Sequence, residues 1–432
     1  MNNEWIQEQF GNIDVNDARL QTRAVKIGLS CAEHSEKSLP GCFEDWAGLK
    51  AAYLFFSNSK ISHQTLQQSH YQNVLEKARF SKELVLFIQD GSELLFNSHP
   101  WTQGLRPTAD SAGNGLMFHS CLVARYDESK QTEILGLSYQ EPWIRSEEKQ
   151  VDREKESEVW LRTLKKSGAP RKNWISVGDR GNDIYTFLNG ASEEGWKFVV
   201  RARHNRRVET DKGQERLFPW IRRQVAKSSS KIFLRAKGQE FSGEVKLEIT
   251  WAEAELLPPD KMSFLPREKV TYIRVWCLER PKIEWLLVTN VPLENEKDVK
   301  KIIDIYRKRW LIEDYHKALK TGCRIEDIQL KQASRILAAF GMIGVMATQL
   351  LSIREHFRLC PTKPVEEVIP KRWVVLVERR LQTKLKTLKD FWHSLARLGG
   401  FIGRKSDGNP GWQTIWGGYT RLQDMLRGAS LF

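Results

Sequence analysis

The chain has 432 residues, of which 41% are apolar and 28% charged, a balance that is typical of a folded protein and excludes a disordered one. Lysine and arginine number 68 against 54 aspartates and glutamates, so the formal net charge is +14. This surplus favours a polyanionic partner, either nucleic acid or an anionic membrane surface, although solubility alone would also explain it.

Cysteine usage and apolar runs narrow the choice of partner. The six cysteines include no Cys-x-x-Cys pair, so we expect free thiols in a reducing cytoplasm rather than a zinc site or disulfides. No basic region followed by an apolar stretch opens the chain, so we expect no signal peptide. The longest apolar run, residues 336–347, is shorter than the roughly 20 residues of a membrane span and predicts a buried helix. We therefore expect no membrane partner, and nucleic acid is favoured.

The first part of the chain predicts a small helical domain over residues 1–70. Asn16 or Asp17 can cap a helix on which Leu20, Ala24 and Ile27 recur at three- and four-residue spacing. Further helices are expected, the last of them after Ser62. The surface of the first helix carries three cations, Arg19, Arg23 and Lys26. They are suited to presenting the helix to a DNA groove, and a solvated helix face explains them equally well.

Residues 71–370 predict an α/β domain with a mixed sheet, because strand patterns come first and then alternate with helices. Short apolar runs predict strands at residues 84–89, 93–96, 116–124, 134–137 and 174–177. A charged helix is expected at about residues 154–166. Residues 195–290 show alternating apolar positions and predict an all-β insertion, after which the chain turns helical.

Two aspartates stand where strand candidates end. Asp90 precedes a glycine and Asp179 follows one. Carboxylates at the strand ends of an α/β sheet are where functional sites tend to form. A turn or helix-capping residue would have the same pattern.

Residues 306–320 predict a helix with two different faces. At about 100° per residue, one stripe collects Tyr306, Arg309, Glu313, Lys317 and Lys320, and the opposite side is apolar. A solvated face with a Glu313–Lys317 pair is the alternative, but it gives no reason for Tyr306 and Arg309 on the same stripe. A carboxylate among cations and a phenol suits a site that holds a divalent metal and phosphates together.

These residues carry a resemblance to a known family. The pattern Tyr306-x2-Arg309-x3-Glu313-x6-Lys320 resembles the Tyr-Arg-Glu-Lys signature of the IS-four class of insertion-sequence transposases, which includes the Tn-five-like enzymes. Residues 88–94 resemble the family's block around its first catalytic aspartate, and residues 177–184 resemble the block around its second. The match is strongest in these three blocks and extends plausibly over nearly the whole chain.

The resemblance implies a ribonuclease-H-like catalytic core. Asp90 would lie on the first strand, Asp179 at the end of the fourth and Glu313 on a later helix. The gap between Asp179 and Glu313 is too long for one strand–helix connection, and the predicted β block fills it where the Tn-five-like enzymes carry a β insertion. Two Mg²⁺ ions, or Mn²⁺ in their place, would be held by the three carboxylates, with Asp90 shared between them. His316, one turn after Glu313, could contact the site, but it is expected rather to orient it or to pack.

The resemblance also assigns DNA contacts. Tyr306, Arg309 and Lys320 would grip phosphates near the cut, and Lys317 lies outside the signature on the same stripe. Trp285 would stack a flipped base, unless it is a core residue at the start of a strand. Apart from the resemblance, a dense basic cluster after residues 198–200 predicts further phosphate contacts, from Arg201, Arg203, His204, Arg206 and Arg207. A solvated loop is the alternative, and the density of cations makes it the less favoured one.

The implied function is cut-and-paste transposition. The enzyme would nick the element end, form and reopen a hairpin, and join the freed end to target DNA as a homodimer on two terminal inverted repeats. Residues 371–432 are expected to form a helical dimerisation region, because their helices look too short to form a core alone. The alternative is that this tail folds back on the catalytic domain. The expected location is the bacterial cytoplasm, at the nucleoid.

Two other functions remain open from the sequence. One is a ribonuclease-H-like nuclease or integrase that does not mobilise an element. The other is an inactive DNA-binding regulator, against which the intact Asp90, Asp179 and Glu313 argue.

Overall fold

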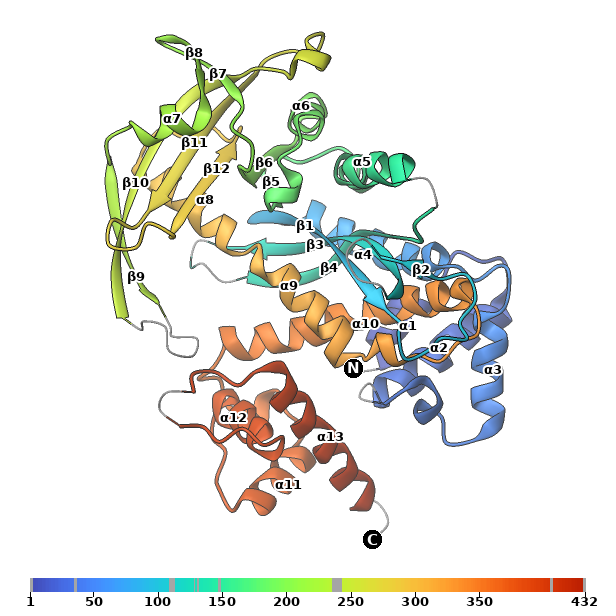
Figure 1. The fold of residues 1–432 in the computed structure, drawn as a ribbon. Coiled ribbons are helices and arrows are strands. Elements are labelled where there is room, and N and C mark those ends of the chain that lie inside the picture. Colours follow the sequence, from blue (N-terminus) through green and yellow to red (C-terminus); the bar gives the residue numbers. More distant parts are fainter. Residues whose placement is uncertain are drawn as a thin grey trace.

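The computed structural model describes residues 3–34, 37–108, 113–127, 129, 132–146, 149–234, 243–404 and 407–429. Helices at both ends of the chain flank a large mixed sheet, and the C-terminal helices lie beside α10, away from the β7–β8 end of the sheet (Figure 1). Short 3₁₀ turns occur at Leu39–Cys42, Arg180–Asn182, Asp260–Met262, Ile325–Asp327 and Val365–Glu367.

The N-terminal helices confirm the helical prediction for this region. They are α1 (Asn3–Phe10), α2 (Ala18–Glu33), α3 (Trp46–Phe56) and α4 (His63–Arg79). The Asp17 carboxylate caps α2 by accepting from the Arg19 backbone N–H at 3.0 Å, and Ser62 caps α4 in a capping box with Thr65. The boundary expected at residue 70 falls inside α4, which therefore links the N-terminal helices to the sheet domain.

Five strands form the centre of the sheet and carry the ribonuclease-H-like core. They are β1 (Leu84–Leu95), β3 (Asn114–Tyr126), β4 (Thr132–Trp143), β5 (Trp174–Gly178) and β6 (Lys197–Arg201). Antiparallel pairing joins β4, β3 and β1, and parallel pairing joins β1, β5 and β6. The parallel crossovers run through α5 (Lys149–Ser167) and α6 (Tyr185–Glu193). The two strands predicted at residues 84–89 and 93–96 are a single strand, so Asp90 lies within β1 and not at its end.

The insertion extends this sheet and does not form a separate one. It contains β7 (Arg207–Thr210), β8 (Gly213–Arg216), α7 (Leu217–Arg222), β9 (Ser228–Leu234), β10 (Gly243–Leu256), β11 (Glu268–Trp276) and β12 (Glu284–Thr289). Because β12 pairs with β6, and the short β2 (Arg106–Pro107) pairs with β3, the described residues form one 12-stranded sheet. The prediction of an all-β block was wrong at α7, where Leu217, Trp220 and Ile221 are buried at helical spacing.

The segment predicted as one helix over residues 306–320 is broken. It comprises α8 (Glu296–Arg307), α9 (Trp310–Lys317) and a π-helical turn (Ala318–Gly322). Between α8 and α9 the backbone tightens: the Lys308 N–H donates to Ile305 and the Arg309 N–H to Tyr306, each across three residues at 3.0 Å. The apolar side faces inward as predicted, with Ile312 and Tyr315 fully buried.

The next helix, α10 (Ala333–Leu359), confirms the prediction of a buried helix at residues 336–347. Among the described residues it is the one helix long and apolar enough to cross a membrane, but 72% of its apolar window is buried inside the protein. It is therefore placed as the central helix of the core.

Gln140 of β4 links three parts of this core. Its Nε2 donates to Ser120 Oγ on β3 and to Tyr315 Oη on α9, both at 2.8 Å. Its Oε1 accepts from Gln67 Nε2 of α4 at 2.9 Å and lies 3.1 Å from His63 Nε2. One buried amide thus ties the sheet to α4 and to the helix that carries Glu313.

The C-terminal helices are α11 (Lys371–Leu381), α12 (Leu388–Leu398) and α13 (Trp412–Gly428). They bury an apolar cluster that includes Val377, Leu388 and Phe391. The cluster is completed by residues that precede residue 371, among them Phe357 at the end of α10. The tail also folds back on the catalytic domain: the Arg354 guanidinium lies 4.8 Å from the Trp412 ring, and Trp416 packs next to Gly322.

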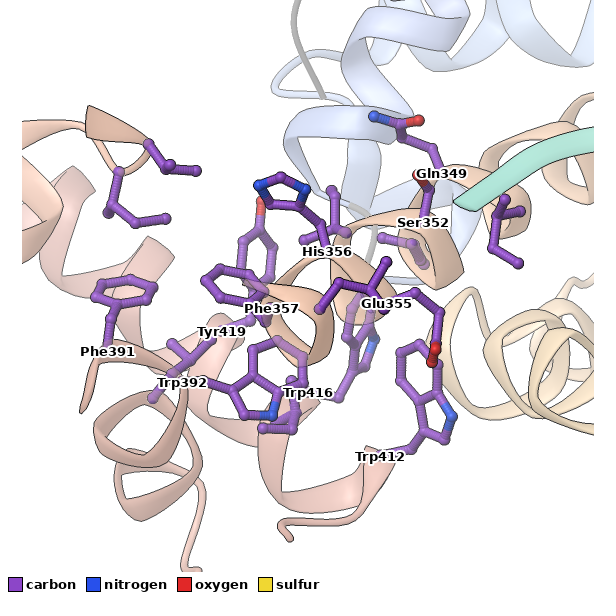
Figure 2. A pocket seen from close by; sticks show the side chains of 18 of the residues that line it. Gln349, Ser352, Glu355, His356, Phe357, Phe391, Trp392, Trp412, Trp416 and Tyr419 are labelled. Atoms are coloured by element: carbon purple, nitrogen blue, oxygen red, sulfur yellow. The ribbon is translucent and has the colours of Figure 1, made fainter. Parts of the chain in front are cut away.

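A cavity of about 650 Å³ separates part of this tail from α10. Figure 2 shows that α10 contributes Gln349, Ser352, Glu355, His356 and Phe357, whereas α12 and α13 contribute Phe391, Trp392, Trp412, Trp416 and Tyr419. The lining is mostly apolar and contains none of the three predicted catalytic carboxylates. The chemistry is therefore to be sought elsewhere.

Gln140→Ala should destabilise the protein, because it leaves several buried polar groups without partners. We expect a loss on the order of 2–4 kcal/mol, seen as a fall of several degrees in the unfolding temperature. The control is Gln64→Ala, which removes an exposed glutamine from α4. Equal unfolding temperatures for the two variants would contradict a linking role for Gln140.

Candidate active site

The fold brings together carboxylates that are far apart in the sequence. Asp90 lies on β1, Asp179 follows the neighbouring parallel strand β5, and Glu313 lies in the first turn of α9. Ligand atoms of Asp90, Glu313 and His316 lie within 4.8 Å of one another. Asp179 is close enough for its charge to act on Asp90.

Asp179 occupies a turn as well as the edge of the site. One of its oxygens, Oδ1, accepts from the Gly181 N–H at 2.7 Å and caps the 3₁₀ turn. The turn is tight, since a Cβ on Gly178 would come within 2.2 Å of the Asn182 side chain. The capping alternative for Asp179 therefore holds, and it fixes the carboxylate in place beside β1.

The surroundings of Asp90 disfavour its charged form. Burial raises the pKa of Asp90 to about 7, and the charges of Asp179 and Glu313 act in the same direction. The Arg309 guanidinium opposes them by donating from Nη1 to Asp90 Oδ2 at 3.3 Å and to Glu313 Oε1 at 3.3 Å. A single guanidinium thus bridges two carboxylates.

These residues fit a divalent cation. Their oxygens are hard ligands of the kind that Mg²⁺ and Mn²⁺ prefer, and the carboxylates repel one another without a cation. Arg309 supplies positive charge next to this site through ion pairs with Asp90 and Glu313. The His316 ring borders the same space and its Nε2 has no hydrogen-bond partner among the described residues.

Beside the carboxylates lies an aromatic and basic group. The ring of Trp285, half-buried on β12, is 6.2 Å from that of Tyr306. Burial raises the pKa of Tyr306, and the guanidinium charges of Arg309 and Arg201 oppose this. The Arg201 guanidinium also donates to the Glu284 carbonyl at 3.2 Å. Trp285, Tyr306 and Arg201 therefore form one wall next to Arg309.

The two lysines of the stripe lie further along the same helix. Lys317 is exposed, with its Nζ 5.3 Å from the centre of the exposed Trp310 ring, and Lys320 is half-buried on the π-helical turn. Both can therefore reach a ligand that approaches Glu313 from solvent.

The structure divides the basic cluster of residues 201–207. Arg203 and His204 are exposed, whereas the Arg206 side chain is 13% exposed and pairs with the buried Asp183 at 3.0 Å. Arg207 pairs with Asp260 at 2.5 Å. The expected phosphate role of Arg206 is corrected, because its guanidinium is committed to a buried internal ion pair.

Asp183 is the residue that the sequence reasoning missed. Its Oδ2 accepts from the backbone N–H groups of Arg203 and His204, at 2.7 and 2.8 Å, and its Oδ1 accepts from Arg206. It thereby shapes the loop that presents Arg203 and His204. The sequence could have drawn attention to Asp183, because it is a second aspartate in the block of residues 177–184 that contains Asp179.

On α2, the predicted DNA-facing cations lie on the outer surface. The Arg19 side chain is 93% exposed and lies 3.4 Å from Asp17, Lys26 is exposed and Arg23 is half-buried. The opposite side of the helix buries Ala24 and Ile27. This helix therefore offers a basic face to solvent, as the spacing predicts.

Comparison with known families gives a consistent result along the chain. The Transposase DNA-binding model matches residues 2–61, the Transposase DDE domain model residues 150–350, and the Transposase Tn5 dimerisation domain model residues 358–431. Among solved structures, the cryo-EM structure of a piggyBac transposase synaptic complex with hairpin DNA is similar over 95% of this chain and 76% of that chain, with 9% identity and a TM-score of 0.37. Asp179 and Glu313 lie inside the DDE match, and Asp90 precedes it.

The raised pKa of Asp90 predicts a pH-dependent penalty in the metal-free protein. Between pH 3.8, the usual pKa of an aspartate, and about pH 7, the Asp90 carboxyl has lost its proton in the unfolded chain but keeps it in the folded chain. The free energy of unfolding therefore falls as the pH rises through this range, and it levels off above pH 7. Asp90→Asn removes the titration. In chelator, it should therefore stabilise the protein more at pH 8.5 than at pH 5, by on the order of 1–3 kcal/mol.

The control is Asp211→Asn at an exposed position, whose effect should be the same at both pH values. A gain from Asp90→Asn that is larger at pH 5 would contradict the prediction. Thermal unfolding of each variant and of the wild type is measured at both pH values. Because each variant is compared with the wild type at the same pH, the contributions of the other titratable groups cancel.

Proposed function

Because this chain belongs to the Tn5-type DDE transposases, we propose that it moves an insertion sequence by cut-and-paste transposition through a hairpin intermediate. As a DDE transposase it is a metal-dependent enzyme that cleaves DNA and transfers strands. The observation that carries the proposal is the meeting of Asp90, Asp179 and Glu313 around a cationic group.

The carboxylates would hold two Mg²⁺ ions, or Mn²⁺ ions, with Asp90 shared and with Asp179 and Glu313 each on one side. When bound, such ions activate the attacking oxygen and neutralise charge on the phosphate. The Gly181 N–H and the first turn of α9 fix the two outer carboxylates in advance. Burial of Asp90, whose side chain is 16% exposed, keeps bulk water away from the shared ligand.

Arg309 lies beside the carboxylates that would hold the ions, where its guanidinium would bind a phosphate of the DNA. Tyr306 is packed beside it, and Lys317 and Lys320 follow along the helix. We assign these four residues to the DNA backbone at the cut, together with the accessible members of the 201–207 cluster, Arg201, Arg203, His204 and Arg207. Arg19, Arg23 and Lys26 on α2 would bind the element end.

The proposed reaction has four steps. Water attacks one strand at the element end and releases a 3′-hydroxyl. That hydroxyl attacks the opposite strand, which closes a hairpin and frees the flanking DNA. A second water reopens the hairpin, and the recovered 3′-hydroxyl attacks target DNA. Trp285 offers its half-buried ring to the base that the tight hairpin displaces.

Two element ends have to be held before either is cut, and two-fold pairing of protomers is the simplest way to hold them. We propose three functional regions: residues 1–70 for DNA binding, 71–370 for catalysis and 371–432 for dimerisation in the synaptic complex. The dimerisation-domain match supports the last assignment. The protein would act on the terminal inverted repeats and on target DNA at the bacterial nucleoid.

Alanine at Asp90, Asp179 or Glu313 should abolish Mg²⁺-dependent cleavage of an element-end duplex and leave end binding within a few-fold. Metal ligands are needed for the chemistry, whereas docking depends on phosphate contacts. The control Asp211→Ala removes an exposed acid and should cut normally. A hairpin on the cleaved end supports transposition. Open ends alone point to a nuclease or integrase, and wild-type protein that binds without cutting points to a regulator.

Trp285→Ala should slow hairpin formation more than the first nick, because only the hairpin needs a displaced base held. Trp276→Ala on the neighbouring strand, another half-buried tryptophan, serves as the control. Single-turnover assays on a pre-nicked substrate separate the two steps. Equal slowing of both steps by Trp285→Ala would identify it as a core residue.

A further inference from the structure

His316 stands at the edge of the carboxylate site without an assigned task. It follows Glu313 by three residues on α9, and residues at this spacing share one face of a helix. One of its ring nitrogens lies within 4.8 Å of carboxylate oxygens of both Asp90 and Glu313. The Glu-x-x-His spacing recurs where helices supply two ligands to one metal ion.

Its surroundings leave the imidazole unsatisfied. His316 is 6% exposed, and its buried Nε2 has no hydrogen-bond partner among the described residues. Its ring neighbours are aromatic: Phe118 meets it edge to face with ring centres 5.2 Å apart, and Tyr315 adjoins it. A buried polar nitrogen without a partner destabilises the fold, so packing alone would be better served by a phenyl ring.

The other buried histidines differ in this respect. His63 Nε2 lies 3.1 Å from Gln140 Oε1, and His119 Nε2 lies 3.0 Å from Gln89 Oε1. His70 uses both nitrogens, with Nδ1 2.6 Å from Gln9 Oε1 and Nε2 accepting from the Leu137 N–H at 2.9 Å. Among these buried histidines, His316 differs because its Nε2 has no hydrogen-bond partner among the described residues. It also lies next to the carboxylates of Asp90 and Glu313.

We propose that His316 is a nitrogen ligand of the metal ion shared by Asp90 and Glu313. This inference rests on the proposed metal site and adds an imidazole to its two carboxylates. The neighbouring Arg309 is the cation that the metal would displace from the two carboxylates. A site with one imidazole among oxygens binds first-row transition ions such as Mn²⁺ in preference to Mg²⁺ and Ca²⁺.

Pulsed electron paramagnetic resonance on the full-length protein with bound Mn²⁺ tests this directly, because a coordinated imidazole modulates the electron spin echo. We expect ¹⁴N modulation in the wild type, which changes to the ¹⁵N pattern when only histidine carries ¹⁵N. His316→Gln should lose it. His119→Gln, at a buried histidine outside the cluster, should keep it. Bound Mn²⁺ without nitrogen modulation in the wild type, or modulation that survives in His316→Gln, overturns the proposal.

Calorimetry separates this proposal from the metal site itself. His316→Gln should weaken Mn²⁺ binding on the order of tenfold and Mg²⁺ or Ca²⁺ binding less than about threefold. Asp90→Ala should abolish binding of all three ions. If Asp90→Ala binds metal normally, the proposed site and the His316 ligand both fail. If Asp90→Ala loses metal while His316→Gln binds Mn²⁺ as tightly as the wild type, only the His316 ligand fails.

Discussion

The mutual repulsion of carboxylates is the constraint on which the structure depends. Asp90 and Glu313 come from distant parts of the chain. Burial raises the pKa of Asp90 to about 7, and the charges of Asp179 and Glu313 add to this effect. The guanidinium of Arg309 opposes it. The contacts that hold β1 against α9 therefore have to overcome the repulsion between the carboxylates. They also have to be rigid enough to keep the carboxylates close enough together to bind a metal ion.

That rigidity comes from buried polar bonds as well as apolar packing. Gln140 joins β4 to β3, α4 and α9, and its partner Tyr315 lies two residues after Glu313. The N-terminal helices, the sheet and α10 share one apolar core with this helix. The helix that carries Glu313 is therefore tied to α4 and to the sheet by a buried hydrogen-bond network.

Much of the fold and the candidate site could be predicted from local patterns. Capping residues and apolar spacing identify α2 and α4, and apolar runs next to Asp90 and Asp179 identify β1 and β5. What could not be predicted depends on contacts between distant segments. The pairing of β12 with β6 merges the insertion with the core, and the ion pair of Asp183 with Arg206 withdraws one cation from the expected DNA surface. The sequence shows that basic residues are clustered, but it does not show which of them form ion pairs inside the fold.

The break between α8 and α9 also escaped the sequence pattern, and it bears on how the site works. On a regular helix, Arg309 would lie on the same face as Glu313. In the structure the backbone tightens at Lys308 and Arg309, and the Arg309 guanidinium extends to β1 and bonds to Asp90. In the proposed function, metal ions compete with that guanidinium for the same oxygens. Arg309 also acts on Tyr306, so the same guanidinium that bonds to Asp90 and Glu313 lies within reach of the aromatic wall where the DNA backbone would pass.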